Sequence, residues 1–391
     1  MSQQAAASRA MDGEHERPLV VLYLFVHAPG DRFVYPNTRA SDSAARLALR
    51  YLECAVTQAA TLRAQDAPCD IVLASNGVER IELGAHGRRL LGALRALGVE
   101  LIEAAYDHRP PGDDPAYPAS RYVFDAILAS CHEDSPGRPV WLTDLDCVWN
   151  RPAAMFAALP QAPAIGCLFI DYPPDWNTVG SERYGSRAEI GALGATEELP
   201  PWIGGELLAG SAASMRELVA QAERADGELA AEEIELATEE QLLTVLGAQG
   251  RVRFTDLSRL GRRLQTGWRH EAQPVQGAQE LAFWHLPAEK GLSLRRTARE
   301  VARGGLPRLR ADMTSPARAA RRFRVGRPSP LRILRDGSWI VAQRAREQVP
   351  ARLRPDGRDR APADPASEGR QGAPADPPSE GREGAPADPA A

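Results

Sequence analysis

The sequence contains a single lysine, Lys290, among 47 basic residues, and it lacks both a long hydrophobic run and a zinc-ligand spacing of cysteines. Its longest apolar segment, residues 19–26, is far too short to cross a bilayer. The five cysteines are odd in number and widely spaced, which favours reduced, structural thiols. Residues 1–17 are polar and do not resemble a secretory signal. We therefore expect a soluble, cytoplasmic protein without disulfides.

Apolar segments rich in β-branched residues alternate with segments of helical periodicity along the first 250 residues. This alternation predicts an α/β fold with a doubly wound, mostly parallel sheet and flanking helices. A region rich in Pro, Gly and Asp at 171–200 indicates a long loop. The expected strands are 18–26, 69–74, 99–104, 139–144 and 164–170, and the expected helices are 41–64, 88–97, 120–129, 213–225 and 232–246.

Composition divides the chain into four parts. Residues 1–17 are expected to be disordered, 18–291 to form the folded domain, 292–350 to form an Arg-rich helical arm, and 351–391 to be a disordered tail. The tail repeats Ala-Pro-Ala-Asp-Pro from Ala361 with a period of 12 residues, and almost nothing in it can be buried.

The basic arm has three interpretations. Residues 289–360 carry 20 basic and 7 acidic side chains. Residues 292–302 and 330–349 place apolar residues among arginines and could form helices. The first interpretation is that the arm packs on the acidic remainder of the chain, and the second is peripheral contact with an anionic membrane on its inner face. The third interpretation is nucleic-acid binding. No nucleic-acid motif is present, so we expect no nucleic-acid partner.

Two aspartates, Asp144 and Asp146, interrupt the apolar segment that begins at Val140. Alternate positions on a strand face the same side, and open α/β sheets bind ligands at the carboxyl ends of their strands. Paired carboxylates there suit Mg²⁺ or Mn²⁺, which take few protein oxygens besides those of a substrate phosphate. The alternative is a polar strand end with two solvated aspartates.

The order of motifs resembles the GT-A class of nucleotide-sugar-dependent glycosyltransferases over residues 17–291. An Asp-x-Asp motif follows the amino-terminal α/β half, then a Gly-Gly-Glu segment at 204–206, an acidic helix start at 238–240 and a late histidine, His285. The resemblance implies a GT-A-like fold. It also implies an enzyme that transfers a sugar from a nucleotide-diphosphate donor, with a UDP-sugar the first to consider, to a hydroxyl acceptor with the help of Mn²⁺ or Mg²⁺.

The same resemblance assigns the metal and diphosphate residues. It makes Asp146 a metal ligand, Asp144 a contact to the ribose or the metal, and His285 a third ligand. In glycogenin-like members a lysine six residues after the histidine contacts the diphosphate, whereas Lys290 follows His285 by five and the intervening glycine is missing. A structural histidine and an incidental loop lysine are the alternatives.

Three carboxylates are candidates for catalysis. The resemblance places Gly204, Gly205 and Glu206 at the acceptor wall and sugar pocket, where glycines allow close approach and a carboxylate could bind sugar hydroxyls or act as a base. The alternative is a tight turn before a helix. Glu239 or Glu240 could also serve as the base, although acidic residues in a first helical turn favour the helix dipole without any catalytic role.

Four further residues are candidates for nucleotide binding. Arg121 and Asp125 begin the helix before the aspartate strand, where related enzymes place an arginine near the diphosphate; an i,i+4 ion pair is the alternative. Asn76 follows the second strand and could bind the base or serve as a turn residue. His27 leaves the first strand where the base usually lies.

Two other functions remain open at this stage. A sugar nucleotidyltransferase would usually carry a Gly-rich loop after the first strand, but residues 26–32 contain a single glycine. A non-catalytic binding or scaffold protein of GT-A-like fold is the other alternative. Turnover of a sugar nucleotide would exclude the scaffold.

Overall fold

The computed structural model describes residues 16–28, 43–79, 83–111, 119–177, 184–194, 198–264, 266 and 276–326. All of them lie within the first of two compact units, Met1–Ser338. The segments expected to be disordered therefore lie outside the described residues, apart from Glu16 and Arg17. So do the second helix expected in the arm, at 330–349, and the tail.

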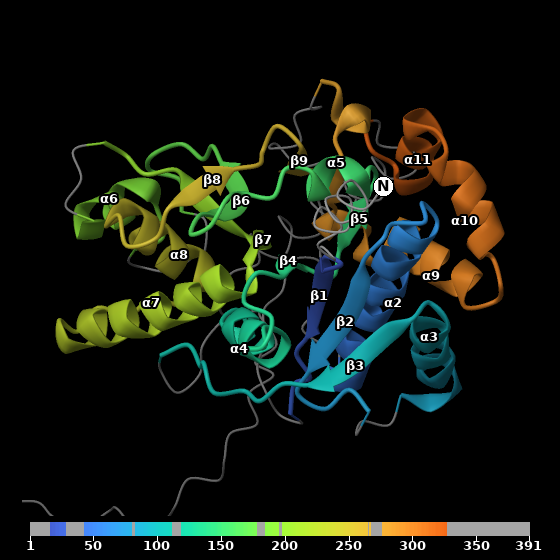
Figure 1. Ribbon diagram of the computed structural model, residues 1–391, viewed down its shortest axis with the longest axis horizontal. Coiled ribbons are helices and arrows are strands. Elements are labelled where there is room, and N and C mark those ends of the chain that lie inside the picture. The colour runs from blue at the N-terminus through green and yellow to red at the C-terminus, as the bar shows by residue number, and fades with distance from the viewer. Residues whose placement is uncertain are drawn as a thin grey trace, which may run out of the picture. The chain divides into compact units, whose positions relative to one another are not determined.

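A seven-stranded sheet with the order β3-β2-β1-β4-β7-β6-β8 forms the centre of the fold (Figure 1). Strands β1, β2, β3 and β4 pair in parallel, and β6 pairs in parallel with β8. Only β7 runs antiparallel to its neighbours β4 and β6. This confirms the predicted α/β class with a mostly parallel sheet. The strands are β1 Leu19–Leu24, β2 Asp70–Ser75, β3 Val99–Glu103, β4 Pro139–Thr143, β6 Ile165–Ile170, β7 Trp202–Ser211 and β8 Phe254–Asp256.

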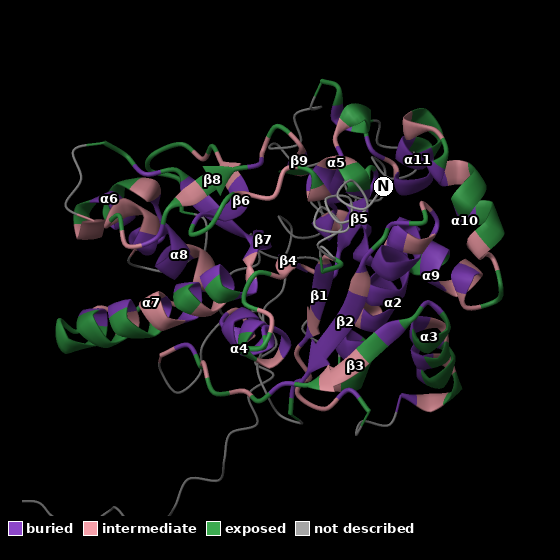
Figure 2. Cartoon of the chain, in the orientation of Figure 1, coloured by how far each residue is buried: buried purple, intermediate pink, exposed green. Residues whose placement is uncertain are grey.

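Helices cover both faces of this sheet because its strands are apolar on both sides. Along β1, Val20, Leu22 and Leu24 belong to one buried cluster, while Leu19 and Val21 belong to another. The first cluster includes residues of α2 and α3, and the second includes residues of α4, α7 and α8. Buried residues are purple on the ribbon in Figure 2. The helices of this part are α2 Ala44–Arg63, α3 Gly84–Ala96, α4 Tyr122–Ser130, α5 Pro152–Phe156, α6 Arg187–Gly194, α7 Ala212–Ala231 and α8 Glu239–Ala248.

A smaller three-stranded sheet has the order β5-β10-β9. Its strands are β5 Cys147–Trp149, β9 Gly261–Arg263 and β10 Phe283–His285. Strand β10 runs antiparallel to β5 and parallel to β9, with His285 opposite Cys147 on one side and Arg263 on the other. Strand β5, which follows β4 in the chain, therefore pairs with residues more than 130 positions later in the sequence.

Several expected element boundaries were wrong. The aspartate strand ends at Thr143 rather than 144, so Asp144 and Asp146 lie in the turn between β4 and β5. Gly204, Gly205 and Glu206 lie inside the ten-residue strand β7, which excludes the tight turn. The expected loop at 171–200 contains α6. Strand β7 is long despite Gly204 and Gly205 because cooperative pairing with β4 favours it.

The helix expected at 232–246 begins only at Glu239, because a capping box fixes its first turn. The Thr238 hydroxyl accepts a hydrogen bond from Gln241 N at 3.3 Å, and the Gln241 amide oxygen accepts one from Thr238 N at 2.9 Å. These bonds satisfy two backbone donors that the helix cannot. The acidic residues Glu232 and Glu233 therefore precede the helix.

Replacing Thr238 by alanine removes half of this capping box. We expect the free energy of unfolding to fall by about 1 kcal/mol, the usual value of a side-chain N-cap. Urea denaturation followed by circular dichroism measures the change. A loss below about 0.3 kcal/mol, or an equal loss in the exposed Thr255→Ala variant, would show that the cap does not stabilise α8.

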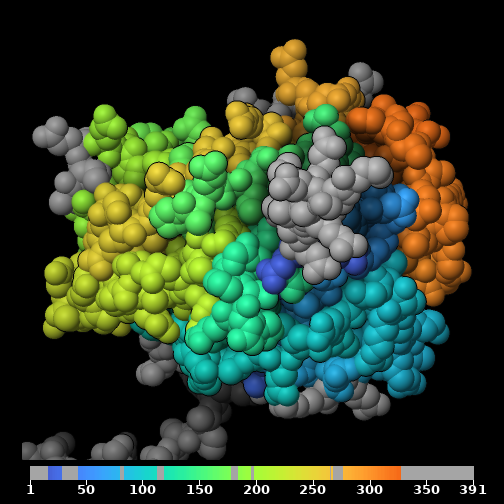
Figure 3. All heavy atoms as spheres, in the orientation of Figure 1, coloured from blue at the N-terminus to red at the C-terminus, as the bar shows by residue number. Residues whose placement is uncertain are grey.

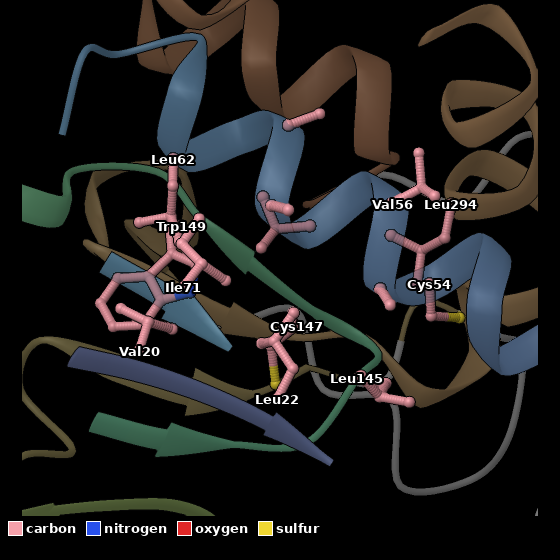
Figure 4. Close-up of a cluster of buried hydrophobic side chains, with 14 of the residues drawn as sticks. Val20, Leu22, Cys54, Val56, Leu62, Ile71, Leu145, Cys147, Trp149 and Leu294 are labelled. Atoms are coloured by element: carbon pink, nitrogen blue, oxygen red, sulfur yellow. The ribbon is translucent and has the colours of Figure 1, made fainter. Parts of the chain in front are cut away.

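The chain continues after β10 into helices that pack on the amino-terminal half. These elements are η2 Pro287–Glu289, the π-helical turn η3 Lys290–Leu294, α9 Arg295–Val301, α10 Leu306–Met313 and α11 Pro316–Phe323. A short helix, η1 Ala278–Glu280, precedes β10. Helix α9 and η3 both contact α2, and Leu294 lies beside Val56 in Figure 4. Residues 52–62 of α2 are consequently buried all round. In Figure 3 the orange atoms of this segment lie against the blue atoms of α2.

All five cysteines are buried and free, as expected. Among the described helices, none has the length and apolar character that crossing a bilayer requires.

Candidate metal and sugar-nucleotide site

Asp144 and Asp146 are held by backbone hydrogen bonds from two other parts of the chain. Asp144 N donates to the Glu206 carbonyl on β7 at 3.1 Å, and Leu286 N, just after β10, donates to the Asp146 carbonyl at 2.9 Å. The Asp144 side chain is 30% exposed and that of Asp146 only 2% exposed. The turn thus presents one accessible and one buried carboxylate at the carboxyl end of β4.

His285 faces both aspartates from β10. Its Nε2 lies 3.6 Å from Asp144 Oδ2 and 3.2 Å from Asp146 Oδ2. One ligand atom from each of the three residues lies within 4.8 Å of the others. Two carboxylate oxygens and an imidazole nitrogen are a donor set that Mn²⁺ accepts, and Mg²⁺ takes the oxygens. The residues therefore fit the predicted metal site.

Lys290 reaches the same cluster from the first position of η3. Its Nζ lies 3.2 Å from Asp146 Oδ2 and 3.2 Å from the Tyr51 hydroxyl, and it lies over the Tyr51 ring at 4.9 Å. The side chain is 10% exposed. The lysine thus reaches Asp146 although its spacing from His285 departs from the glycogenin-like pattern.

Arg263 on β9 is a site residue that the sequence analysis missed. Its guanidinium binds Glu206 through two hydrogen bonds, Nε to Oε1 at 3.0 Å and Nη2 to Oε2 at 2.8 Å. It also contacts Glu240 and donates to the Tyr172 hydroxyl at 3.0 Å. Glu206, whose side chain is fully buried, places Oε1 3.4 Å from His285 Nδ1. Arg263 therefore connects the predicted carboxylates to the predicted metal ligand.

Glu239 and Glu240 have different surroundings at the start of α8. Glu240 contacts Arg263 and accepts hydrogen bonds from Trp202 Nε1 at 2.8 Å and Gly205 N at 3.4 Å. Glu239 packs over Gly205, where an added Cβ would lie 2.5 Å from its Oε1. Its Oε2 is buried and has no hydrogen-bond partner among the described residues.

Gly204 and Gly205 both make room for carboxylates. A Cβ on Gly204 would lie 2.1 Å from Glu206 Oε2, and one on Gly205 would overlap Glu239. Real Cβ atoms do not approach oxygen this closely, so a side chain at either position would displace a carboxylate of the site. The close approach that the sequence predicted for these glycines is therefore to protein carboxylates.

Neighbouring charges outweigh burial in setting the pKa values of His285, Asp146 and Glu206. Burial opposes the charge of His285, but Asp146 and Glu206 outweigh it and raise the His285 pKa to about 10. Burial likewise opposes ionisation of Asp146, but Lys290 and His285 hold its pKa well below the ordinary value. Burial also opposes the Glu206 charge, yet Arg263 and His285 lower its pKa to about 2. The carboxylates of Asp146 and Glu206 thus stay ionised beside protein cations.

The pKa values of two other carboxyl groups of the site are raised. Partial burial raises the pKa of Asp144, and the charge of Asp146 adds to this effect. Burial, with the charges of Glu240 and Asp144, raises the pKa of Glu239 well above its ordinary value. Tyr23, the fifth residue of β1, donates its hydroxyl hydrogen bond to Asp144 Oδ1. Tyr23 was also missed, although its place near the end of the central strand was a usable signal.

The structure gives the candidate nucleotide-binding residues other contacts. The Asn76 side chain bonds to the Val26 backbone twice, accepting from N at 2.6 Å and donating to O at 3.0 Å. Buried His27 packs edge-on against the Phe25 ring at 4.8 Å. Arg121 pairs with Asp226 at 2.6 Å and donates to the Leu236 carbonyl at 2.6 Å. These contacts hold loops at the carboxyl edge of the sheet.

Asp125 is paired with His108 rather than with Arg121. His108 Nδ1 lies 2.7 Å from Asp125 Oδ1, and its Nε2 lies 3.0 Å from Glu223 on α7. The Asp125 hydrogen bond raises the His108 pKa despite partial burial. The pair therefore fixes the segment after β3 to α4 and α7.

This pair predicts a pH-dependent stability. Because the folded His108 pKa is raised, its contribution is complete below the unfolded value of 6.5 and is lost as pH rises through the folded value. We expect His108→Ala to lower the free energy of unfolding more at pH 6 than at pH 9. Urea denaturation at both pH values measures the difference. Equal losses at the two values would show that the pair is not charged in the folded protein.

Comparison with known proteins gave structural matches alone. No protein-family model matches the sequence, and no curated protein matches it. The galactosyltransferase LgtC, solved with donor and acceptor sugar analogues, is similar with a TM-score of 0.44 and 10% identity over 73% of this chain and 95% of that chain. The apo bifunctional glycosyltransferase WbbM is similar with a TM-score of 0.43 and 10% identity over 70% of this chain and 46% of that chain. Both of these proteins are named as glycosyltransferases.

Proposed function

We propose that this chain is a metal-dependent glycosyltransferase that moves a sugar from a nucleotide-diphosphate donor, with a UDP-sugar as the first candidate, to a hydroxyl acceptor. The observation that carries the proposal is the group of Asp144, Asp146 and His285, whose ligand atoms lie within 4.8 Å of one another. The group lies at the carboxyl end of β4, the edge at which open α/β sheets bind ligands.

Asp144, Asp146 and His285 would hold Mn²⁺ or Mg²⁺. When bound, such an ion neutralises the negative charge that develops on a diphosphate leaving group. Lys290, 3.2 Å from Asp146 Oδ2, adds a compact positive charge beside that position. The diphosphate would therefore lie beside the bound ion and within reach of Lys290.

Glu206 is proposed to orient His285. Its two oxygens are held by Arg263, and Oε1 faces His285 Nδ1 at 3.4 Å. The raised pKa keeps a proton on Nε2 in the metal-free protein, and a bound ion would displace it. The nearby Glu206 carboxylate would then favour a proton on Nδ1, so that Nε2 could serve as the metal ligand. Glu206 thus supports the site through His285.

Glu239 is proposed to contact the reacting hydroxyl groups. Glu206 and Glu240 each use both oxygens in contacts within the protein, whereas Glu239 Oε2 has no hydrogen-bond partner among the described residues. Because the Glu239 pKa is raised, its protonated form could donate a hydrogen bond to a sugar hydroxyl, and its ionised form would be a stronger base toward an acceptor hydroxyl.

The experiment is donor turnover without acceptor. We expect slow hydrolysis of a UDP-sugar from a panel of common donors, present with Mn²⁺ and absent with EDTA. Glu239→Gln should reduce turnover by about 100-fold, as expected for a lost acid–base group. The control is Glu232→Gln, which changes an exposed carboxylate directly after α7. Absence of turnover across the panel would favour the non-catalytic alternative.

The cytoplasmic location and a membrane contact of the arm stay predictions.

A further inference from the structure

A cavity of about 1030 Å³ lies among α9, α10 and α11. Eight arginines and two carboxylates, Glu300 and Asp312, are among its lining residues. Three of the arginines come from α9 and three from α11: Arg295, Arg296 and Arg299, and Arg318, Arg321 and Arg322. None of the lining residues belongs to the candidate metal site, so this cavity requires its own explanation.

Both lining carboxylates are held by one buried arginine. Arg322 is 8% exposed, and its guanidinium lies 2.7 Å from Glu300 Oε2 and 2.5 Å from Asp312 Oδ2. Arg308 also lies 3.5 Å from Glu300 Oε1. The carboxylates therefore fix the wall of the cavity and leave most of its arginines without a negative partner inside it.

The remaining positive charge is poorly neutralised. Arg295 and Arg299 share one carboxylate of α2, Glu53, at 3.4 and 3.0 Å. Arg303 and Arg321 are exposed and form no ion pair with any residue in the described ranges. Concentrating like charges in this way costs stability unless an anion is bound.

We propose that this cavity binds phosphate that is carried either by a diphosphate or by a phospholipid headgroup. Guanidinium groups match phosphate oxygens through paired hydrogen bonds, and the cavity takes arginines from three helices on different sides. Its volume exceeds what one phosphate fills, so a diphosphate or a phospholipid headgroup fits the shared chemistry. The proposal does not depend on the proposed glycosyl transfer.

The test compares two double variants of equal charge. Arg303→Ser with Arg321→Ser removes the two exposed cavity arginines. Arg88→Ser with Arg89→Ser, which changes two exposed arginines of α3, is the control. Calorimetry measures pyrophosphate binding in EDTA, which disables the candidate metal site. Sedimentation measures binding to phosphatidylcholine vesicles with and without phosphatidic acid.

We expect the cavity variant to weaken phosphate binding by about tenfold or more while the control binds like the unchanged protein, because each lost guanidinium removes charge-assisted hydrogen bonds. Loss of pyrophosphate binding assigns a soluble ligand, and loss of phosphatidic-acid binding alone assigns a lipid headgroup; both support the proposal. It is overturned if neither probe binds or if both variants weaken binding equally. Tighter binding of a DNA oligonucleotide than of either probe also overturns it.

Discussion

Replacing Asp146 by alanine is expected to abolish metal-dependent binding of UDP. Asp146 is 2% exposed, and its Oδ2 lies 3.2 Å from both His285 Nε2 and Lys290 Nζ. Its carboxylate therefore contacts both positively charged side chains of the site. Loss of this ligand should weaken Mn²⁺-dependent UDP binding by about 100-fold or more, because the ion contributes several kcal/mol of charge stabilisation. Calorimetry with UDP in Mn²⁺ and in EDTA measures the effect.

Two further variants make this result interpretable. Asp146→Asn keeps the shape of the side chain and should lose metal-dependent binding too, which separates loss of charge from loss of packing. Asp134→Ala removes an exposed aspartate before β4 and should bind like the unchanged protein. Unchanged UDP affinity of Asp146→Ala in Mn²⁺ would show that the aspartate turn does not hold the diphosphate.

Replacing Arg263 by methionine is expected to destabilise the fold and the metal site together. Arg263 is the partner that neutralises Glu206, whose side chain is fully buried. Leaving a buried carboxylate without its partner should lower the free energy of unfolding by about 3 kcal/mol. Mn²⁺ affinity should fall by about 10- to 100-fold, because His285 loses its oriented neighbour. Urea denaturation and Mn²⁺ titration measure the two effects.

A second substitution separates stability from metal binding. Adding Glu206→Gln to Arg263→Met removes the unpaired charge, so most of the stability should return while the Mn²⁺ affinity stays low. Arg262→Met, an exposed neighbour on β9, is the matched control and should change neither. If Arg263→Met kept both the stability and the metal affinity within error, Arg263 would have no positioning role.

The sequence was informative about the fold where the periodicity of apolar residues is strong. Segments such as Leu19–Leu24 and Ile165–Ile170 are apolar on both faces, which only a sheet covered on both sides can bury. Strand β7 was missed because Gly204 and Gly205 lower its strand propensity, and pairing with β4 overrides this. The three-residue strands β5, β9 and β10 are too short to show any periodicity.

The candidate site was predictable for residues that belong to a motif. Asp144, Asp146, His285 and Lys290 lie close together, and the roles that the resemblance implied for them stay predictions. Arg263 gave no local signal, since it is one arginine among many and its partners lie on β7 and α8. A buried ion pair between distant segments cannot be recognised before the fold places its members together.

The most direct test of the metal site is a crystal structure with UDP and Mn²⁺ measured at the manganese absorption edge. The proposed metal site predicts an anomalous peak among Asp144, Asp146 and His285, with the UDP diphosphate beside it and near Lys290. UDP bound elsewhere, or a manganese peak remote from these three residues, would contradict it.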